Sequence, residues 1–351
     1  MKSKEISSLP GESEARSDWR EVYVGGSPEA EEAHFRDLAA KIARIQQENR
    51  IHADSTTSLR TFYAKIVVGV INAELSFRDD LPSDLHAGHF VAGAKFSTIV
   101  RLSNASGMAR SDMMPDLRGA ALKISLPDNT YHDLLMASYP ISHARDATQF
   151  VEIARIGAGP FNRIRSQMIE IFGLLETERI INNLRQANRP SKSLALESYW
   201  SRGAILWGDA GPVKLRLSPV LDNCTALESM KDSDDALRFD FATRLNNAAV
   251  LFALHVQKYK NEQSTPIEDA AVEWKEEDAP WLHVATLNIP TQDILALKGK
   301  IVRDYIDSLA FNPWTAPATF RPLGNLNRAR RTVYKASAAE WRTSYVRGSK
   351  V

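Results

Sequence analysis

The chain has 351 residues, of which 44% are hydrophobic, so it can bury a large core, and barrels of this length often fold as one unit. Its 44 basic and 43 acidic residues leave a net charge of +1, which does not favour a nucleic-acid-binding protein. The single cysteine, Cys224, excludes an internal disulfide and a multi-cysteine metal site and fits the reducing cytoplasm.

The first 55 residues are expected to form an arm followed by a helix. Residues 1–26 are polar and contain no apolar stretch of the kind found in secretory signals, and no run in the chain approaches the length of a membrane span. Ser27 suits a helix cap and Pro28 suits the first helical position. Apolar residues then recur on one helical face, at Phe35, Leu38, Ala39, Ile42 and Ile45. We expect this face to pack on the body of the protein or on a partner subunit of a homo-oligomer.

From about residue 56 the pattern favours short strands, and later helices. Strands are predicted over 64–78, 96–102, 120–126, 213–220, 249–257 and 283–289. Helices are predicted over 146–157, 161–188, 291–310 and 326–346. The helix over 161–188 has an apolar stripe formed by Ile164, Met168, Phe172 and Leu175. Together these elements predict an α+β fold, an antiparallel β-barrel with a helical insertion and C-terminal helices.

The last sixty residues contain the pair that suggests chemistry. Arg330 and Tyr334 are four residues apart, so on a helix they share one face. A guanidinium beside a phenol favours the phenolate, because a nearby opposite charge lowers its pKa. A phenolate is a hard anionic ligand for ferric iron. Pairs of this kind are also common on helix surfaces.

The residues around the pair resemble the C-terminal signature of small catalase-related haem proteins. The matching segments are 311–314, 321–330 and 333–334, and upstream 99–105 and 115–123 resemble the barrel core of catalases. The likeness covers roughly residues 56–342 in scattered motifs. It implies an N-terminal arm and helix over 1–55 and a catalase-like haem-binding domain over 56–351, with the barrel over about 56–290 and C-terminal helices over about 291–351.

The same resemblance implies roles in binding haem b. Tyr334 would be the axial ligand of the iron, held as phenolate by Arg330, and Arg342 further along the helix would help to balance charge unless it is a surface residue. Arg60 and Arg101 would hold the propionates, because an arginine fork matches a carboxylate. The alternative for Arg101 is a charge at the barrel rim.

The distal side departs from the family pattern. Tyr63 stands where catalases have a histidine, and a phenol with a pKa of about 10 donates a hydrogen bond but is a poor base. Residues 135–139, where the distal asparagine is expected, contain no Asn. His143 is either a relocated acid–base group or a core histidine. Ser103 would support the distal residue, and Phe150 would pack on the macrocycle unless it is an ordinary core residue.

The resemblance therefore implies a haem-dependent oxidoreductase that acts on a small organic substrate with a peroxide or a hydroperoxide. Hydroperoxide rearrangement is known in this family, for example in the allene oxide synthase domain of corals. Two alternatives stay open, a residual catalase that disproportionates hydrogen peroxide and a non-catalytic haem-binding protein.

Several other residues receive structural predictions. Tyr199 and Trp200 could line a substrate channel or pack structurally, and Glu268 and Asp269 are expected as turn and cap residues. His86 and His89 lie in a loop without a third ligand, so we expect a surface role for both.

Overall fold

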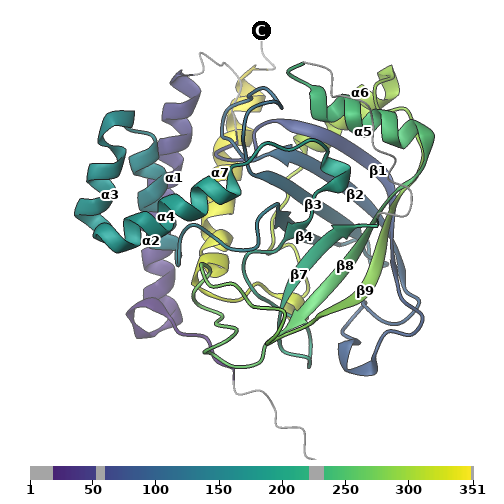
Figure 1. Cartoon of the computed structure of the whole chain (residues 1–351), viewed down its shortest axis with the longest axis horizontal. Coiled ribbons are helices and arrows are strands. Elements are labelled where there is room, and N and C mark those ends of the chain that lie inside the picture. The colour runs from purple at the N-terminus through teal and green to yellow at the C-terminus, as the bar shows by residue number, and fades with distance from the viewer. Residues whose placement is uncertain (1–18, 53–59, 221–232, 349–351) are drawn as a thin grey trace, which may run out of the picture.

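A closed β-barrel and a layer of helices beside it make up the described part of the chain (Figure 1). The computed structural model describes residues 19–52, 60–220 and 233–348, so Cys224 lies outside the described residues. Side chains of the last helix are described as far as residue 338, so the Arg342 side chain is also outside them. Within the described ranges, none of the helices combines the length and apolar character needed to cross a membrane.

Eight strands pair in a closed antiparallel ring, which confirms the predicted barrel with its helical insertion and C-terminal helices. In the order of pairing, the ring contains β1 (Ile66–Phe77), β2 (Lys95–Asn104), β3 (Arg118–Ser125), β4 (Tyr131–Ala137), β5 (Tyr199–Trp200), β7 (Pro212–Pro219), β8 (Val250–Lys258) and β9 (Trp281–Ile289). A short ninth strand, β6 (Ile205–Leu206), pairs with β7 outside the ring. The two residues of β5 close the barrel, since Trp200 pairs with both Ala137 and Arg216.

The barrel interior is apolar and contains a cluster of aromatic side chains. Leu215 and Leu217 of β7 are fully buried there, as the alternation of a strand with one buried face requires. Two histidines lie within the aromatic cluster, and His89 Nε2 is 3.1 Å from His132 Nδ1. Burial lowers their pKa values to about 4 for His89 and about 3 for His132, so both are neutral at physiological pH. The predicted surface role of His89 was therefore wrong.

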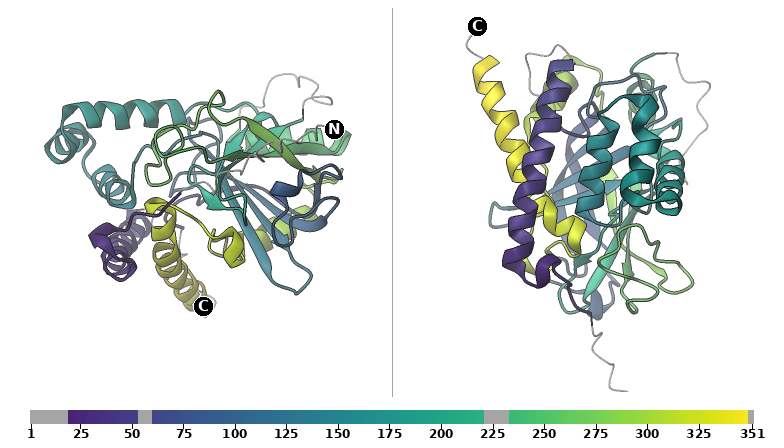
Figure 2. Two further views of the ribbon diagram at one scale, coloured as in Figure 1. Left: turned by 90° about the horizontal axis from the view of Figure 1, so that it is seen from below. Right: turned by 90° about the vertical axis from the view of Figure 1, so that its left-hand side faces the viewer.

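Helix α1 (Pro28–His52) begins as predicted and packs on the same chain. The Ser27 hydroxyl accepts a hydrogen bond from the Ala30 amide at 3.2 Å. All five residues of the predicted apolar face are buried. They pack against α2 (Ala147–Gly157) and α7 (Asn325–Gly348), and Figure 2 shows α1 and α7 side by side.

The predicted helix over 161–188 is two helices, α3 (Ile164–Phe172) and α4 (Leu174–Ala187). Gly173 between them has a φ of +76°, a left-handed conformation that breaks the helix and that glycine adopts without strain. The break turns Leu175 outwards, where it is 86% exposed, so its predicted place on the apolar stripe was wrong.

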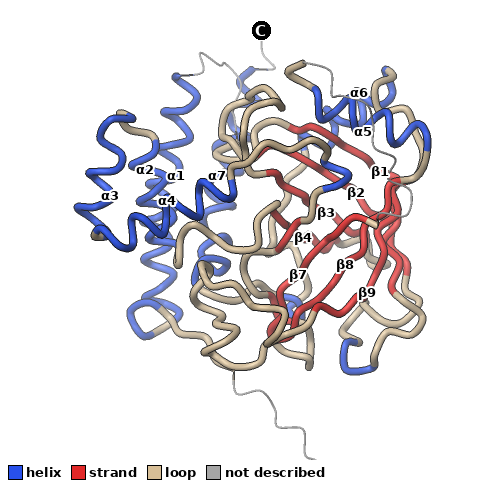
Figure 3. Tube along the Cα trace, in the orientation of Figure 1, coloured by secondary structure: helices blue, strands red, loops and turns tan. Residues whose placement is uncertain are grey.

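Two further helices, α5 (Ala236–Asn247) and α6 (Leu297–Ser308), lie beside β1, on the other side of the barrel from α1 (Figure 3). Neither α5 nor β4 was predicted as an element from the sequence.

A buried cluster of charges attaches the N-terminal arm to the start of α7. Arg328 Nε lies 2.6 Å from Glu31 Oε2, and its Nη1 lies 2.8 Å from Glu268 Oε1 and 3.0 Å from Glu21 Oε1. The Tyr23 ring lies 4.7 Å from the same guanidinium. Burial alone would lower the pKa of Arg328, but the hydrogen bonds to Glu31 and Glu268 raise it well above its usual value. Glu268 is therefore an ion-pair partner of α7 rather than only a turn residue.

Candidate functional site

The Arg330–Tyr334 pair lies on α7 as the four-residue spacing predicts. The Arg330 guanidinium is 5.9 Å from the centre of the Tyr334 ring, and its Nη1 donates to Asn327 Oδ1 at 3.1 Å. Asn327 in turn donates to the Ala204 carbonyl at 2.9 Å. A Cβ atom on Gly203 would lie 2.4 Å from Asn327 Nδ2, so glycine at this position leaves room for the amide. Asn327 thereby holds Arg330 beside Tyr334.

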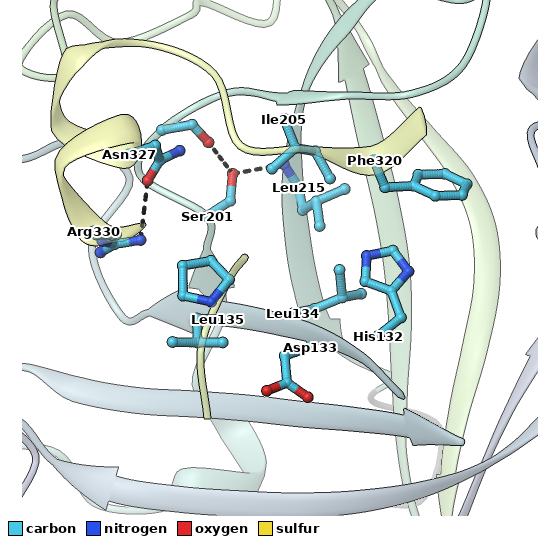
Figure 4. A pocket seen from close by; sticks show the side chains of 12 residues that line it. His132, Asp133, Leu134, Leu135, Ser201, Ile205, Leu215, Phe320, Asn327 and Arg330 are labelled. Carbon is cyan, nitrogen blue, oxygen red and sulfur yellow. Dashed lines mark hydrogen bonds between the residues drawn. The ribbon is translucent and has the colours of Figure 1, made fainter. Parts of the chain in front are cut away.

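A small cavity of about 20 Å³ lies between Arg330 and the barrel wall (Figure 4). Its polar lining residues include His132, Asp133, Ser201, Asn327 and Arg330. The Ser201 hydroxyl donates to the Gly203 carbonyl at 2.8 Å and accepts from the Leu215 amide at 3.0 Å. This volume fits about one water molecule, so the cavity belongs to the packing behind Arg330 and is too small for a substrate.

Arg60 and Arg101 are brought together by a carboxylate that the sequence analysis missed. Arg101 Nη2 lies 2.9 Å from Asp307 Oδ1 on α6, and Arg60 Nη2 donates to the Asp307 carbonyl at 2.7 Å. Burial, and then the like charge of Arg101, lowers the pKa of Arg60 to about 10. The Nε atom of Arg101 is buried and has no hydrogen-bond partner among the described residues. Arg101 is thus a buried cation rather than a residue at an exposed rim.

Tyr63 lies against the barrel wall in a strained conformation. Its φ is +59°, which is uncommon for a residue with a side chain. A Cβ atom on Gly119 of β3 would lie 2.5 Å from Tyr63 Cε1, so only glycine leaves room for the ring. Ser103 pairs with Gly119 across the β2–β3 ladder, and its Oγ would be 3.1 Å from the same Cβ. The predicted neighbours Tyr63 and Ser103 therefore meet at one point of the wall.

His143 and Phe150 lie together as the predicted distal segment requires. Their ring centres are 5.1 Å apart, and Phe150 makes an edge-to-face contact with Phe62 at 5.6 Å. Burial, followed by the charges of Arg202 and Arg179, lowers the pKa of His143 to about 3. The imidazole is therefore neutral throughout the physiological range.

The Tyr63 phenol also stays protonated. Burial raises its pKa, against the opposing effect of Arg202. The charges of Tyr334 and Arg330 both act on Tyr63, so the α7 pair lies within electrostatic reach of the Tyr63 phenol.

The sequence analysis missed Arg202, which lies two residues after the end of β5. Its side chain is only 8% exposed, and its Nε donates to the Ile141 carbonyl at 2.9 Å. The neighbouring stretch 199–201 was noted, and a basic residue next to it was the available signal. Tyr199 is fully buried and donates to the Leu194 carbonyl at 2.9 Å, so of its two predicted roles it packs structurally and does not line a channel.

Asp269 forms an ion pair with Arg145 and also accepts from the Ala271 amide at 2.9 Å, as a turn residue does. No three His, Cys, Asp or Glu side chains of the described residues gather as a metal site would require.

Comparisons with known proteins give one sequence relative and many structural ones. No protein-family model matches the chain. A catalase-related peroxidase of Mycolicibacterium paratuberculosis is 26% identical over 276 residues, which cover 76% of this chain and 84% of that protein.

Three solved structures represent the similar folds. Catalase A from Saccharomyces cerevisiae superposes with a TM-score of 0.63 at 12% identity, over 83% of this chain and 62% of that one. A fungal catalase gives 0.61 at 13% identity, over 85% and 60%. A bacterial catalase gives 0.60 at 15% identity, over 97% and 67%. The chain thus spans only about three fifths to two thirds of the catalase chains that share its fold.

Proposed function

We propose that this protein, which is catalase-like in fold and in sequence, is a haem-dependent oxidoreductase. It acts on a small organic substrate with a peroxide, or on a hydroperoxide, as a peroxidase, a peroxygenase or a hydroperoxide-rearranging enzyme. The observation that carries this proposal is the Arg330–Tyr334 pair of α7, which lies within electrostatic reach of the Tyr63 phenol.

The residues near Tyr334 and Tyr63 fit haem b. Tyr334 is the residue that would ligate the iron, and the Arg330 guanidinium, 5.9 Å from the centre of its ring, places a positive charge beside it. The aromatic pair of Phe62 and Phe150 offers an apolar wall of the kind that a porphyrin packs against. Gly119 leaves room for the Tyr63 ring against the barrel wall.

Arg60 and Arg101 are the residues that would hold the propionates. The Nε of Arg101 has no partner among the described residues, which leaves a donor for a further carboxylate. Asp307 already contacts both guanidiniums, and its side chain is the more exposed partner of each pair. A propionate would therefore share the two arginines with Asp307 at the edge of the site.

When bound, haem supplies a ferric centre at which peroxides are activated. The Tyr63 phenol, protonated because burial raises its pKa, donates a hydrogen bond to a peroxide oxygen. His143 with a pKa of about 3 is a poor proton acceptor, so it acts as a neutral hydrogen-bonding group and not as a proton relay. Rapid disproportionation of hydrogen peroxide needs such a relay, which favours an organic substrate.

The absorption spectrum of the purified full chain, before and after addition of a peroxide, tests the proposal. We expect a ferric Soret band of the tyrosinate type that shifts on peroxide addition. Tyr334→Phe should lose haem or bind it much more weakly. Tyr305→Phe is the matched control, because Tyr305 is an exposed tyrosine of α6, and it should keep the wild-type spectrum.

Other results would lead to different conclusions. An unchanged haem spectrum in Tyr334→Phe would refute the ligand assignment. Oxygen release from hydrogen peroxide would instead support a residual catalase. If the chain takes up no haem when iron and haem precursor are ample, the enzymatic proposal fails and a non-catalytic binding role replaces it.

A further inference from the structure

Arg202 is a buried cation that no carboxylate neutralises among the described residues. Its Nε donates to the Ile141 carbonyl at 2.9 Å, whereas its buried Nη2 has no hydrogen-bond partner. The largest electrostatic effects on it come from Tyr63, Arg330 and Tyr139, and it forms no ion pair with a carboxylate of the described residues. Burying a guanidinium without a counter-ion destabilises a protein, so a residue of this kind calls for an anionic partner.

The backbone at Arg202 is also unusual. Its φ is +55°, in the left-handed region that residues with a Cβ atom seldom adopt. Only three residues other than glycine have positive φ in the described ranges, and Tyr63 is another of them. The side chains of Tyr63 and Arg202 interact with one another. Strained residues of this kind gather at ligand sites, where the strain holds a side chain in place for binding.

We propose that Arg202 binds the carboxylate of an anionic organic substrate, so that the site selects carboxylic acids and their hydroperoxides over neutral molecules. A guanidinium fork matches a carboxylate through two parallel hydrogen bonds. His143, on whose imidazole Arg202 acts electrostatically, lies against Phe150, so the organic body of the substrate meets apolar and aromatic surface next to the charge. This inference names the substrate class of the proposed enzyme and rests on that function.

Ligand binding to the full chain, purified with its cofactor, tests Arg202 directly. The probes are benzoate and octanoate, each matched with its neutral amide, at constant ionic strength, and the readouts are calorimetric Kd values and melting temperatures. We expect the carboxylates to bind about 10- to 100-fold more tightly than the amides, as a charge-assisted pair provides. Arg202→Gln should abolish this preference, and Arg202→Lys should restore part of it.

Two further variants separate recognition from folding. Arg202→Gly removes the side chain and relieves the positive φ, so it should fold at least as well as wild type and still lose the carboxylate preference. Arg216→Gln is the matched control. Arg216 is a partly buried arginine, and its Nε, like the Nη2 of Arg202, has no hydrogen-bond partner among the described residues. Its guanidinium lies over the Trp281 ring at 4.6 Å, on the face of β7 opposite the buried Leu215 and Leu217. It should keep the wild-type preference.

Either of two results would overturn the proposal. Equal affinities of wild type for acids and amides would show that Arg202 does not recognise a carboxylate. A tenfold or greater loss of haem affinity in both Arg202→Gln and Arg202→Gly would assign the guanidinium to a propionate instead. If the wild-type chain contains no haem, the proposed function fails, but the melting-temperature comparison of acid with amide still decides on Arg202.

Discussion

The charge cluster at the start of α7 makes a sharp prediction for Arg328→Met. The substitution leaves Glu31 and Glu268 without their guanidinium, while Glu21 keeps Arg321 at 2.6 Å. Removing one partner of a buried ion pair costs about 3–5 kcal/mol, because the remaining charge stays desolvated. With an unfolding entropy of about 2.1 cal/mol/K per residue over 351 residues, the melting temperature should fall by about 4–7 °C.

The pH dependence of this loss has a defined sign. In wild type, burial tends to raise the pKa of Glu31, but hydrogen bonds from Arg328 and the Val24 amide outweigh it and lower the pKa. Glu31 therefore stabilises the fold above its unfolded pKa, and this contribution is lost as the pH falls through the folded value. Without Arg328, burial dominates and the pKa of Glu31 rises. The variant should then gain stability on acidification, so its deficit should shrink from pH 7 to pH 5.

Thermal unfolding followed by circular dichroism at pH 5, 6, 7 and 8 measures both effects. Arg78→Met is the control, since Arg78 pairs with the exposed Asp80 at the surface and its loss should leave the stability almost unchanged. A deficit for Arg328→Met below about 1 kcal/mol, or one that grows as the pH falls, would refute the reasoning.

Three further predictions concern the barrel and the site. Gly119→Ala should push the Tyr63 ring off the wall and cost about 1–3 kcal/mol, because the new Cβ would lie 2.5 Å from Tyr63 Cε1; a variant with unchanged stability and activity would contradict this contact. Burial lowers the pKa values of His89 and His132 in the folded chain to about 4 and 3. Below pH 6.5 the unfolded chain therefore binds more protons than the folded chain, and the free energy of unfolding should fall by about 1.4 kcal/mol per pH unit for each histidine between pH 6.5 and 4. Replacing both with Phe should remove this slope in pH-dependent melts, and an unchanged slope would exclude these histidines as its source. Because neither Tyr63 nor His143 titrates between pH 5 and 8, neither group should make the turnover rate depend on pH in this range. His143→Phe should retain haem and have a reduced turnover rate. A wild-type rate that follows a single pKa near 6.5, and that loses this dependence in His143→Phe, would instead make His143 the acid–base group.

The parts of the structure that local rules control could be predicted from the sequence. The start of α1 follows from a serine cap and a proline in the first turn, and the Arg330–Tyr334 pair follows from helical spacing. The break at Gly173 was missed, because a lone glycine in a helical pattern does not by itself end a helix. The two-residue strand β5 was missed because it is too short to have a period.

The site was predictable where each residue acts with its sequence neighbours or matches a family motif, and not where its partner comes from a distant element. Asp307 reaches Arg101 only because α6 packs beside β1 and β2, and no local pattern marks that contact. Arg202 has ordinary neighbours in sequence, and its importance comes from its burial without a counter-ion. Whether a buried charge has a partner is a property of the folded chain.

The pairing of β1 with β9 has a consequence for how the barrel forms during synthesis. β1 pairs on one side with β2, its neighbour in the chain, and on the other with β9, where Glu74 meets Asn288 more than two hundred residues later. Strands β1 to β4 can therefore assemble as soon as they leave the ribosome, but the outer edge of β1 stays unpaired until almost the whole chain has emerged. An open strand edge of twelve residues is a template for aggregation. Until β9 arrives, the nascent chain depends on chaperones to cover that edge.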